Sequence, residues 1–323
     1  MLIGHQRLWD FLVKSAQREK LAHAYLFSGQ EEIGKKTLAL EFAKWLLCED
    51  KKKDQACGAC RNCRDISQGQ HPDVFLLAPR QEEKKNILKT YEIGVEEIRD
   101  FIHHLSLLPY RSTYKIAIVD EADWLSREAM NAFLKTLEEP SRQSLIFLVT
   151  SDFKNILPTI ISRCQLLKFL PVPLKEIEEA ARRVEFKNKA VLNQALRLCA
   201  GRPGKLFKIL ARPEILAEQE KQTETFKKLL RSDLAWRFEW ARDAAKDAVA
   251  LSETLSLWLR QLRDGLLAKN DCAALSLEKD PPELKKGNRE LVQMMREIHR
   301  AREAISSASF DTRLILENLM LKI

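Results

Sequence analysis

Short apolar runs alternate with amphipathic segments over the first half of the chain. The apolar runs are long enough for buried strands but too short for helices, and they lie at residues 24–27, 73–77, 115–120 and 145–150. A helical period of apolar positions predicts helices before and between these runs, at residues 5–18, 35–48 and 95–107. Buried strands that alternate with helices form parallel sheets covered on both faces. The pattern therefore predicts an α/β domain, with a solvated turn at residues 82–85.

Beyond residues 170–173 the strand pattern stops, and the remaining sequence has the spacing of amphipathic helices. Apolar residues at 251, 255, 258, 259, 262 and 266 share one helical face, and those at 291, 294, 295, 298 and 305 share another. Pro281 and Pro282 are expected to break the region between them. The C-terminal part is thus predicted to be helical.

The composition of the chain limits its class of partner and its location but does not indicate a function. The chain has 323 residues, 10 glycines and a net charge of +8. That charge favours an anionic partner, although it is equally consistent with solubility alone. Neither an apolar targeting segment nor a run of about 18 apolar residues is present. We therefore expect a cytoplasmic location and no contact with a membrane.

Four of the seven cysteines lie close together: Cys48, Cys57, Cys60 and Cys63. Two residues between successive cysteines allow both sulfurs to point at one ion, and four thiolates match a closed structural zinc site. Four free thiols in a surface insertion are the alternative. The scattered cysteines, at positions 164, 199 and 272, are interpreted as small core residues.

The segment Ser28 to Thr37 resembles a phosphate-binding loop, which requires G-x4-G-K-[ST]. Gly29, Gly34 and Lys35 fit this pattern. The position that should offer a hydroxyl to Mg²⁺ is Lys36, and Thr37 comes one residue too late. Glu31 and Glu32 lie where backbone amides would face phosphate. We therefore interpret the loop as a degenerate nucleotide site that is weak or empty, so a role for ATP and Mg²⁺ is doubtful.

Two acids at the end of the third strand are better preserved. In active NTPases an aspartate at this place holds Mg²⁺ and a following glutamate polarises the attacking water. Asp120 and Glu121 have these positions. The alternative is that they cap the next helix.

Several stretches together resemble the delta-prime family of bacterial DNA polymerase III clamp-loader subunits, which belongs to the AAA+ class. They are residues 23–29, the cysteine cluster, and residues 119–123, 131–140, 157–164 and 201–205; residues 311–317 resemble a closing collar helix. The motor gamma/tau subunits share these signals but have an intact phosphate loop. The resemblance implies a RecA-like AAA+ domain with a zinc-module insertion at residues 1–168, a helical lid at 169–211 and an all-α collar at 212–323.

The resemblance also implies roles for individual residues. Arg163, in Ser162-Arg163-Cys164, would be an arginine finger that acts on ATP bound by a neighbouring subunit. Thr150 lies at the position of sensor 1 and Lys205 near that of sensor 2. The implied partners are gamma/tau and delta subunits, the sliding clamp, and primer-template DNA contacted through its backbone. The basic runs at 51–53 and 227–228 are interpreted as solvated and mostly paired with nearby acids.

Three classes of function remain in competition. The first is a non-catalytic clamp-loader subunit of DNA polymerase III that helps to open the sliding clamp and load it on primed DNA. The second is an ATP-hydrolysing loader motor of the gamma/tau type. The third is a stand-alone zinc protein that binds nucleic acid. Mg²⁺-dependent ATP turnover would favour the second class, and salt-dependent DNA affinity in isolation the third.

Overall fold

The computed structural model describes the backbone of residues 2–84, 87–141, 143–184, 186, 188–272, 286–306 and 311–323. The chain divides into two compact units. The first contains Met1–Lys187 and Gly201–Leu206, and the second contains Asn188–Ala200 and Phe207–Ile323. The finer division into sheet domain, lid and collar stays a prediction.

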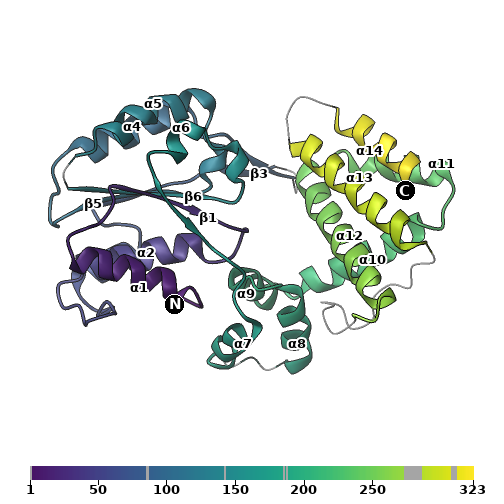
Figure 1. Ribbon diagram of the computed structural model, residues 1–323, viewed down its shortest axis with the longest axis horizontal. Helices are drawn as coiled ribbons and strands as arrows, with labels where there is room; N and C mark the ends of the chain where they lie inside the picture. The colour runs from purple at the N-terminus through teal and green to yellow at the C-terminus, as the bar shows by residue number, and fades with distance from the viewer. Residues whose placement is uncertain are drawn as a thin grey trace. The chain divides into compact units, whose positions relative to one another are not determined.

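A five-stranded parallel sheet forms the centre of the first unit (Figure 1). Its order is β2 (Val74–Leu77), β5 (Lys115–Val119), β6 (Ser144–Thr150), β1 (Ala24–Ser28) and β7 (Gln165–Lys168). All its neighbouring strands run parallel, with Ser28 beside Thr150 at the end of the β1–β6 pair. The carboxyl ends of the strands therefore meet at one edge, where ligands bind in open parallel sheets. The predicted α/β class is confirmed.

Helices cover both faces of this sheet (Figure 1). Alternate side chains of β1 point to opposite faces: Tyr25 and Phe27 belong to one hydrophobic cluster, and Ala24 and Leu26 to the other. The first cluster includes side chains of α1 (Gln6–Gln17) and α2 (Lys35–Leu47). The second includes side chains of α4 (Val95–Ser106), α5 (Arg127–Glu138) and α6 (Pro158–Ile161). Shorter elements of this unit are α3 (Arg61–Ser67), η1 (Ala122–Trp124), η2 (Phe153–Asn155) and α7 (Leu174–Arg182).

Two features of the first unit differ from the prediction. The edge strand β7 was not predicted, because it has four residues and only Leu167 among them is buried, so no long apolar run marks it. Residues 82–84 of the expected turn lie in an antiparallel strand pair instead, with β3 (Gln81–Lys84) paired to β4 (Ile87–Thr90), and residue 85 lies outside the described residues. The polar composition of β3 concealed this strand, since backbone pairing needs no buried side chain.

The second unit is helical, as predicted. Its helices are α8 (Lys189–Leu198), α10 (Glu214–Leu229), α11 (Leu234–Ala244), α12 (Ala248–Lys269), α13 (Asn288–Ser306) and α14 (Thr312–Lys322), while α9 (Pro203–Ala211) begins in the first unit. Trp258 is fully buried in the main cluster of this unit, where its ring stacks on that of Phe226. Pro281 and Pro282 lie outside the described residues. Cys199 is buried as expected, but the expectation for Cys272 is wrong, because this side chain is exposed after the end of α12.

Among the described residues, no helix is both long and apolar enough to cross a membrane.

Candidate functional site

The loop between β1 and α2 contains both glycines of the phosphate-loop pattern, and the local geometry restricts each of them. Gly34 precedes α2 with φ of 105°, a left-handed conformation that side chains disfavour. A Cβ atom on Gly29 would lie 2.7 Å from the carbonyl oxygen of Phe169. At the other side of the loop, the N–H of Gly204 donates to the carbonyl of Glu32 at 2.8 Å. Both loop glycines are thus required by geometry, and the chain near Lys205 packs against the loop.

Lys35 is turned onto its own loop. Its ammonium donates to the carbonyl oxygens of Gly29 and Gln30, both at 2.6 Å. The side chain is buried, and this burial lowers the pKa of Lys35, against the raising influence of nearby carboxylates, Asp123 first. The lysine that would neutralise phosphate therefore satisfies loop carbonyls in this conformation.

Lys36 forms an ion pair with Asp120, with 3.0 Å between Nζ and Oδ2. Lys36 occupies the position at which the motif has an Mg²⁺-binding hydroxyl, and Asp120 is the aspartate that is expected to hold the ion. An ammonium therefore supplies the positive charge that a metal would bring to Asp120. Thr37 lies half-buried on the first turn of α2.

The neighbouring acids complete a negative cluster at the edge of the sheet. Burial, followed by the charge of Asp120, raises the pKa of Glu121, whose φ of 49° is in the left-handed region. Thr150 donates its hydroxyl to Asp123 at 2.7 Å, and Ser151 donates its N–H to the same oxygen at 3.1 Å. The hydroxyl of Thr150 is thus committed within the chain. The sequence prediction did not include Asp123, whose partners come from a strand 27 residues away.

Arg163 lies after α6, and its guanidinium is oriented by three groups. One terminal nitrogen lies 2.6 Å from a carboxylate oxygen of Glu138 at the end of α5. The other donates to the carbonyl of Thr159 at 2.8 Å and to the hydroxyl of Ser162 at 3.3 Å. The side chain keeps 34% of its surface exposed. Arg163 is thus held in one direction yet accessible, and Glu138 is a partner that the motif alone did not reveal.

The four clustered cysteines meet in space. The sulfurs of Cys48, Cys57, Cys60 and Cys63 all lie within 4.8 Å of one another, and those of Cys48 and Cys60 are 3.9 Å apart. A tetrahedral zinc with bonds of about 2.3 Å separates its sulfurs by about 3.8 Å, so the cluster fits such an ion. The predicted cluster is confirmed as a geometry able to hold a metal.

Backbone amides support these sulfurs. The N–H groups of Cys57, Cys60 and Cys63 donate to the sulfurs of Cys48, Cys57 and Cys60 at 3.3, 3.2 and 3.4 Å. The amides of Cys60 and Ala59 lower the pKa of the Cys57 thiol to about 7. Burial raises the pKa of Cys48 and Cys63. Burial therefore opposes ionisation of Cys48 and Cys63, and a bound cation would offset this cost.

Residues 4–173 match the family described as DNA polymerase III, delta subunit. A Pseudomonas aeruginosa protein named DNA polymerase III subunit delta' is 34% identical over 232 residues, which are 71% of this chain and 67% of that protein. DNA polymerase III subunit tau of Bacillus subtilis is 37% identical over 168 residues, but these cover only 28% of tau and 52% of this chain. A gamma subunit-related protein from Thermotoga maritima has a crystal structure with 20% identity and a TM-score of 0.47 over 96% of this chain and 97% of that chain.

Proposed function

We infer the function of this chain from its family: it belongs to the DNA polymerase III delta-subunit family, and we propose that it is a clamp-loader subunit that hydrolyses no ATP itself. In this proposal it joins gamma/tau and delta subunits in the cytoplasm. The assembled loader opens the sliding clamp and places it on primed DNA. The chain contributes Arg163 to the ATP site of a neighbouring subunit.

The ion pair between Lys36 and Asp120 carries the non-catalytic part of this proposal. Mg²⁺ binds through oxygen ligands and bridges the phosphates in NTPases. Here the hydroxyl ligand is absent and an ammonium 3.0 Å from Asp120 already neutralises the carboxylate. The inward turn of Lys35 and the engagement of Thr150 by Asp123 agree with a pocket satisfied without a nucleotide.

The environment of Arg163 supports its proposed action in a neighbouring site. A guanidinium remains charged and can contact two phosphate oxygens at once. Glu138 and the carbonyl of Thr159 hold the group in place at the surface, which reduces the conformational freedom that it would lose on meeting a phosphate.

The cysteine cluster is proposed to bind structural zinc. Four thiolates leave no open coordination position, so the ion would stabilise the loop between α2 and α3 rather than activate water. Cys48, Cys57, Cys60 and Cys63 would be its ligands.

A motor subunit of the gamma/tau type is the second candidate, because the match to tau is as high in identity as that to the delta' relative. The two candidates differ in ATP turnover by the chain itself. The Lys36–Asp120 pair favours the first.

The proposal is tested by reconstituting the loader with a tau-type ATPase and comparing ATP turnover. The Arg163→Ala variant is expected to assemble normally and to lower turnover at the adjoining site by about 10³-fold or more, as for other arginine fingers. Arg182→Ala is the matched control, since Arg182 also pairs with a glutamate, at 2.7 Å within α7, and its side chain is exposed. Glu138→Gln would give an intermediate loss through misorientation of Arg163. Unchanged turnover with Arg163→Ala would remove the proposed role.

A further inference from the structure

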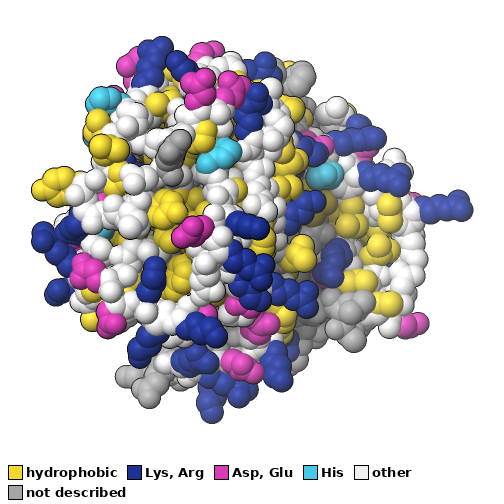
Figure 2. Space-filling view, turned by 60° about the vertical axis from the view of Figure 1, so that its left-hand side comes forward, with side chains coloured by type: hydrophobic (Ala, Val, Ile, Leu, Met, Phe, Trp, Pro, Cys, Tyr) yellow, Lys and Arg dark blue, Asp and Glu magenta, His cyan; other side chains and the backbone are white. Residues whose placement is uncertain are grey.

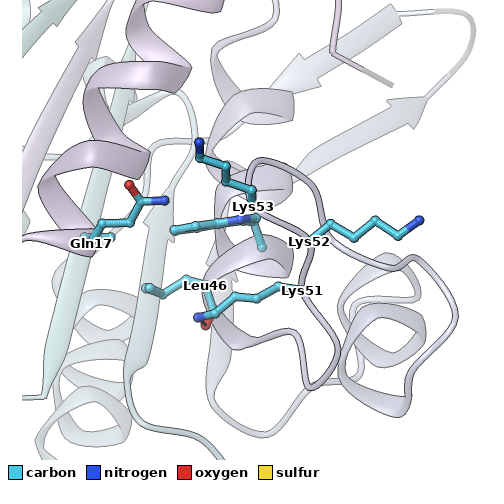
Figure 3. Close-up of a pocket in the computed structure, with 7 residues that line it drawn as sticks. Gln17, Leu46, Lys51, Lys52 and Lys53 are labelled. Atoms are coloured by element: carbon cyan, nitrogen blue, oxygen red, sulfur yellow. Dashed lines mark hydrogen bonds between the residues drawn. The ribbon is translucent and has the colours of Figure 1, made fainter.

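A groove of about 320 Å³ lies between α1 and the loop that carries the first two clustered cysteines (Figure 3). Its apolar wall is formed by Ala16, Trp45 and Leu46, and its polar side chains are Gln17 and the three lysines at 51–53. The same loop contains Glu49, Asp50 and Asp54, but none of these acids lines the groove. The loop is thus neutral in sequence yet presents only positive charge to this space.

Lys51 is fixed before any ligand arrives. Its ammonium lies 5.1 Å from the centre of the Trp45 ring and donates to the carbonyl of Leu46 at 3.3 Å. A cation over an indole face is attracted by the electrons of the ring. Less conformational freedom is therefore lost when this ammonium meets an anion.

Figure 3 separates the three lysines by direction. The side chains of Lys51 and Lys53 extend on the side toward α1 and Gln17, whereas Lys52 points away from them. All three side chains are exposed, and none forms an ion pair with any acid that the structure describes. The interpretation of this run as paired with nearby acids is therefore wrong, and two ammonium groups remain available at the groove.

Trp45 lines the groove next to the ammonium of Lys51. The residue is 3% exposed, and its indole N–H has no hydrogen-bond partner among the described residues. That nitrogen has less than 1 Å² of accessible surface, so a ligand in the groove would meet the ring rather than the N–H. The groove thus combines two exposed cations with an apolar wall, an arrangement that favours an anionic ligand.

The loop itself is held in place at several points. The indole N–H of Trp9 donates to the carbonyl of Asp54 at 3.2 Å, and Lys52 and Gln55 exchange two backbone hydrogen bonds. Cys48 and Cys57 flank the loop on either side. The lysines are therefore presented by a braced turn rather than by a free chain.

We propose that this groove binds the phosphodiester backbone of nucleic acid, with Lys51 and Lys53 as the phosphate contacts and the ring of Trp45 as the support that holds Lys51 in place. Charge density alone does not select this place, because basic side chains are spread over the face in Figure 2 with acids among them. The arrangement of the groove selects it. Contacts of this kind carry affinity without reading the bases.

The test measures binding of a fluorescent oligothymidine to the full-length, zinc-loaded chain by anisotropy at several salt concentrations. A single strand releases about 0.7 counterions for each phosphate neutralised. The Lys51→Gln/Lys53→Gln double variant is therefore expected to reduce the slope of log K against log salt by about 1.4. Trp45→Phe is expected to weaken binding without changing that slope. The control is Lys227→Gln/Lys228→Gln, which removes the same charge and also includes a lysine over an indole ring, 4.7 Å from Trp236.

Each outcome decides the matter. A slope reduced only in the groove variant, together with DNA protection of Lys51 and Lys53 from acetylation, supports the proposal. Equal reductions in both double variants would assign binding to net charge and overturn it. An unchanged slope in the groove variant would also overturn it. If pyrophosphate displaces the oligonucleotide at equal concentration, the groove binds a small free anion rather than the nucleic-acid backbone, and the proposal is overturned. None of these results depends on Arg163 or on ATP turnover.

Discussion

Replacing Lys36 by threonine restores the hydroxyl that a phosphate-binding loop needs and removes the ammonium beside Asp120. The variant sequence at residues 29–36 then satisfies the G-x4-G-K-[ST] pattern. We expect two effects of opposite sign. The unliganded protein should lose stability, and it should gain stabilisation by Mg²⁺ and ATP that the parent chain lacks.

The size of the first effect follows from the geometry of the pair. Two unit charges 3.0 Å apart attract by about 5–6 kcal/mol at an effective dielectric constant of about 20. The side chain of Lys36 is 42% exposed, so solvent screening and side-chain entropy reduce the net contribution to about 1 kcal/mol. In a unit of this size such a loss lowers the melting temperature by about 2–4 °C.

The second effect, stabilisation by Mg²⁺ and ATP, arises because a ligand that binds only the folded protein shifts the folding equilibrium toward it. A ligand at about 100 times its dissociation constant stabilises the protein that binds it by about 2.7 kcal/mol. The Lys36→Thr variant should then melt about 5–10 °C higher with saturating Mg²⁺ and ATP. Lys36→Met is the matched control, because it removes the same ion pair without adding a hydroxyl. It should show the loss but not the gain.

Calorimetry or dye-based melting of the three proteins, with and without Mg²⁺ and ATP, measures both effects. A parent chain stabilised by Mg²⁺ and ATP as strongly as Lys36→Thr would refute the reasoning, since its pocket would then accept the metal despite the ammonium. Equal behaviour of the threonine and methionine variants would refute it as well, because the hydroxyl would then contribute nothing.

Two further predictions concern stability. Cys60→Ser should reduce the zinc content from about one ion per chain to a small fraction and lower the melting temperature, as measured by metal analysis and calorimetry; full zinc content would contradict a four-cysteine site. Asp73→Asn should cost about 3 kcal/mol near neutral pH, because the buried carboxylate accepts the N–H groups of Tyr110, Arg111 and Ser112. Burial alone would raise the pKa of Asp73, but these donors outweigh it and lower that pKa below 3.8. The stability that this carboxylate adds is then complete above pH 3.8 and is lost as the pH falls through the pKa of Asp73 in the folded protein. Chemical denaturation should therefore show a difference in free energy of unfolding between the parent chain and the variant that shrinks in acid. A difference that stays constant with pH would contradict this account.

Much of the first unit could be predicted from the sequence because its signals are local. The apolar runs of β1, β5 and β6 mark strands by themselves, and the helical period marks α2 and α4. The edge strand β7 and the polar strand β3 lack such signals, because neither contains a long apolar run and each is specified by backbone pairing with another strand.

The same distinction holds at the candidate sites. The spacing of the cysteines is local, and the sequence predicted their meeting. The partners of Lys36, Thr150 and Arg163 come from other strands and helices, and only the fold determines them. A motif gives the residue type at a position, whereas the hydrogen bonds and ion pairs of that side chain depend on which residues the fold places beside it.

Helix α2 separates the phosphate-loop region from the cysteine cluster. Its 13 residues, at about 1.5 Å each, place the phosphate-loop end and the cysteine end about 20 Å apart. Physiological salt screens charges over about 8 Å, so an ammonium at one end barely senses a carboxylate at the other. Substitutions at Lys36 and at Lys53 should accordingly be additive. The fold therefore allows nucleotide binding at the phosphate loop and metal binding at the cysteine cluster to change independently of each other.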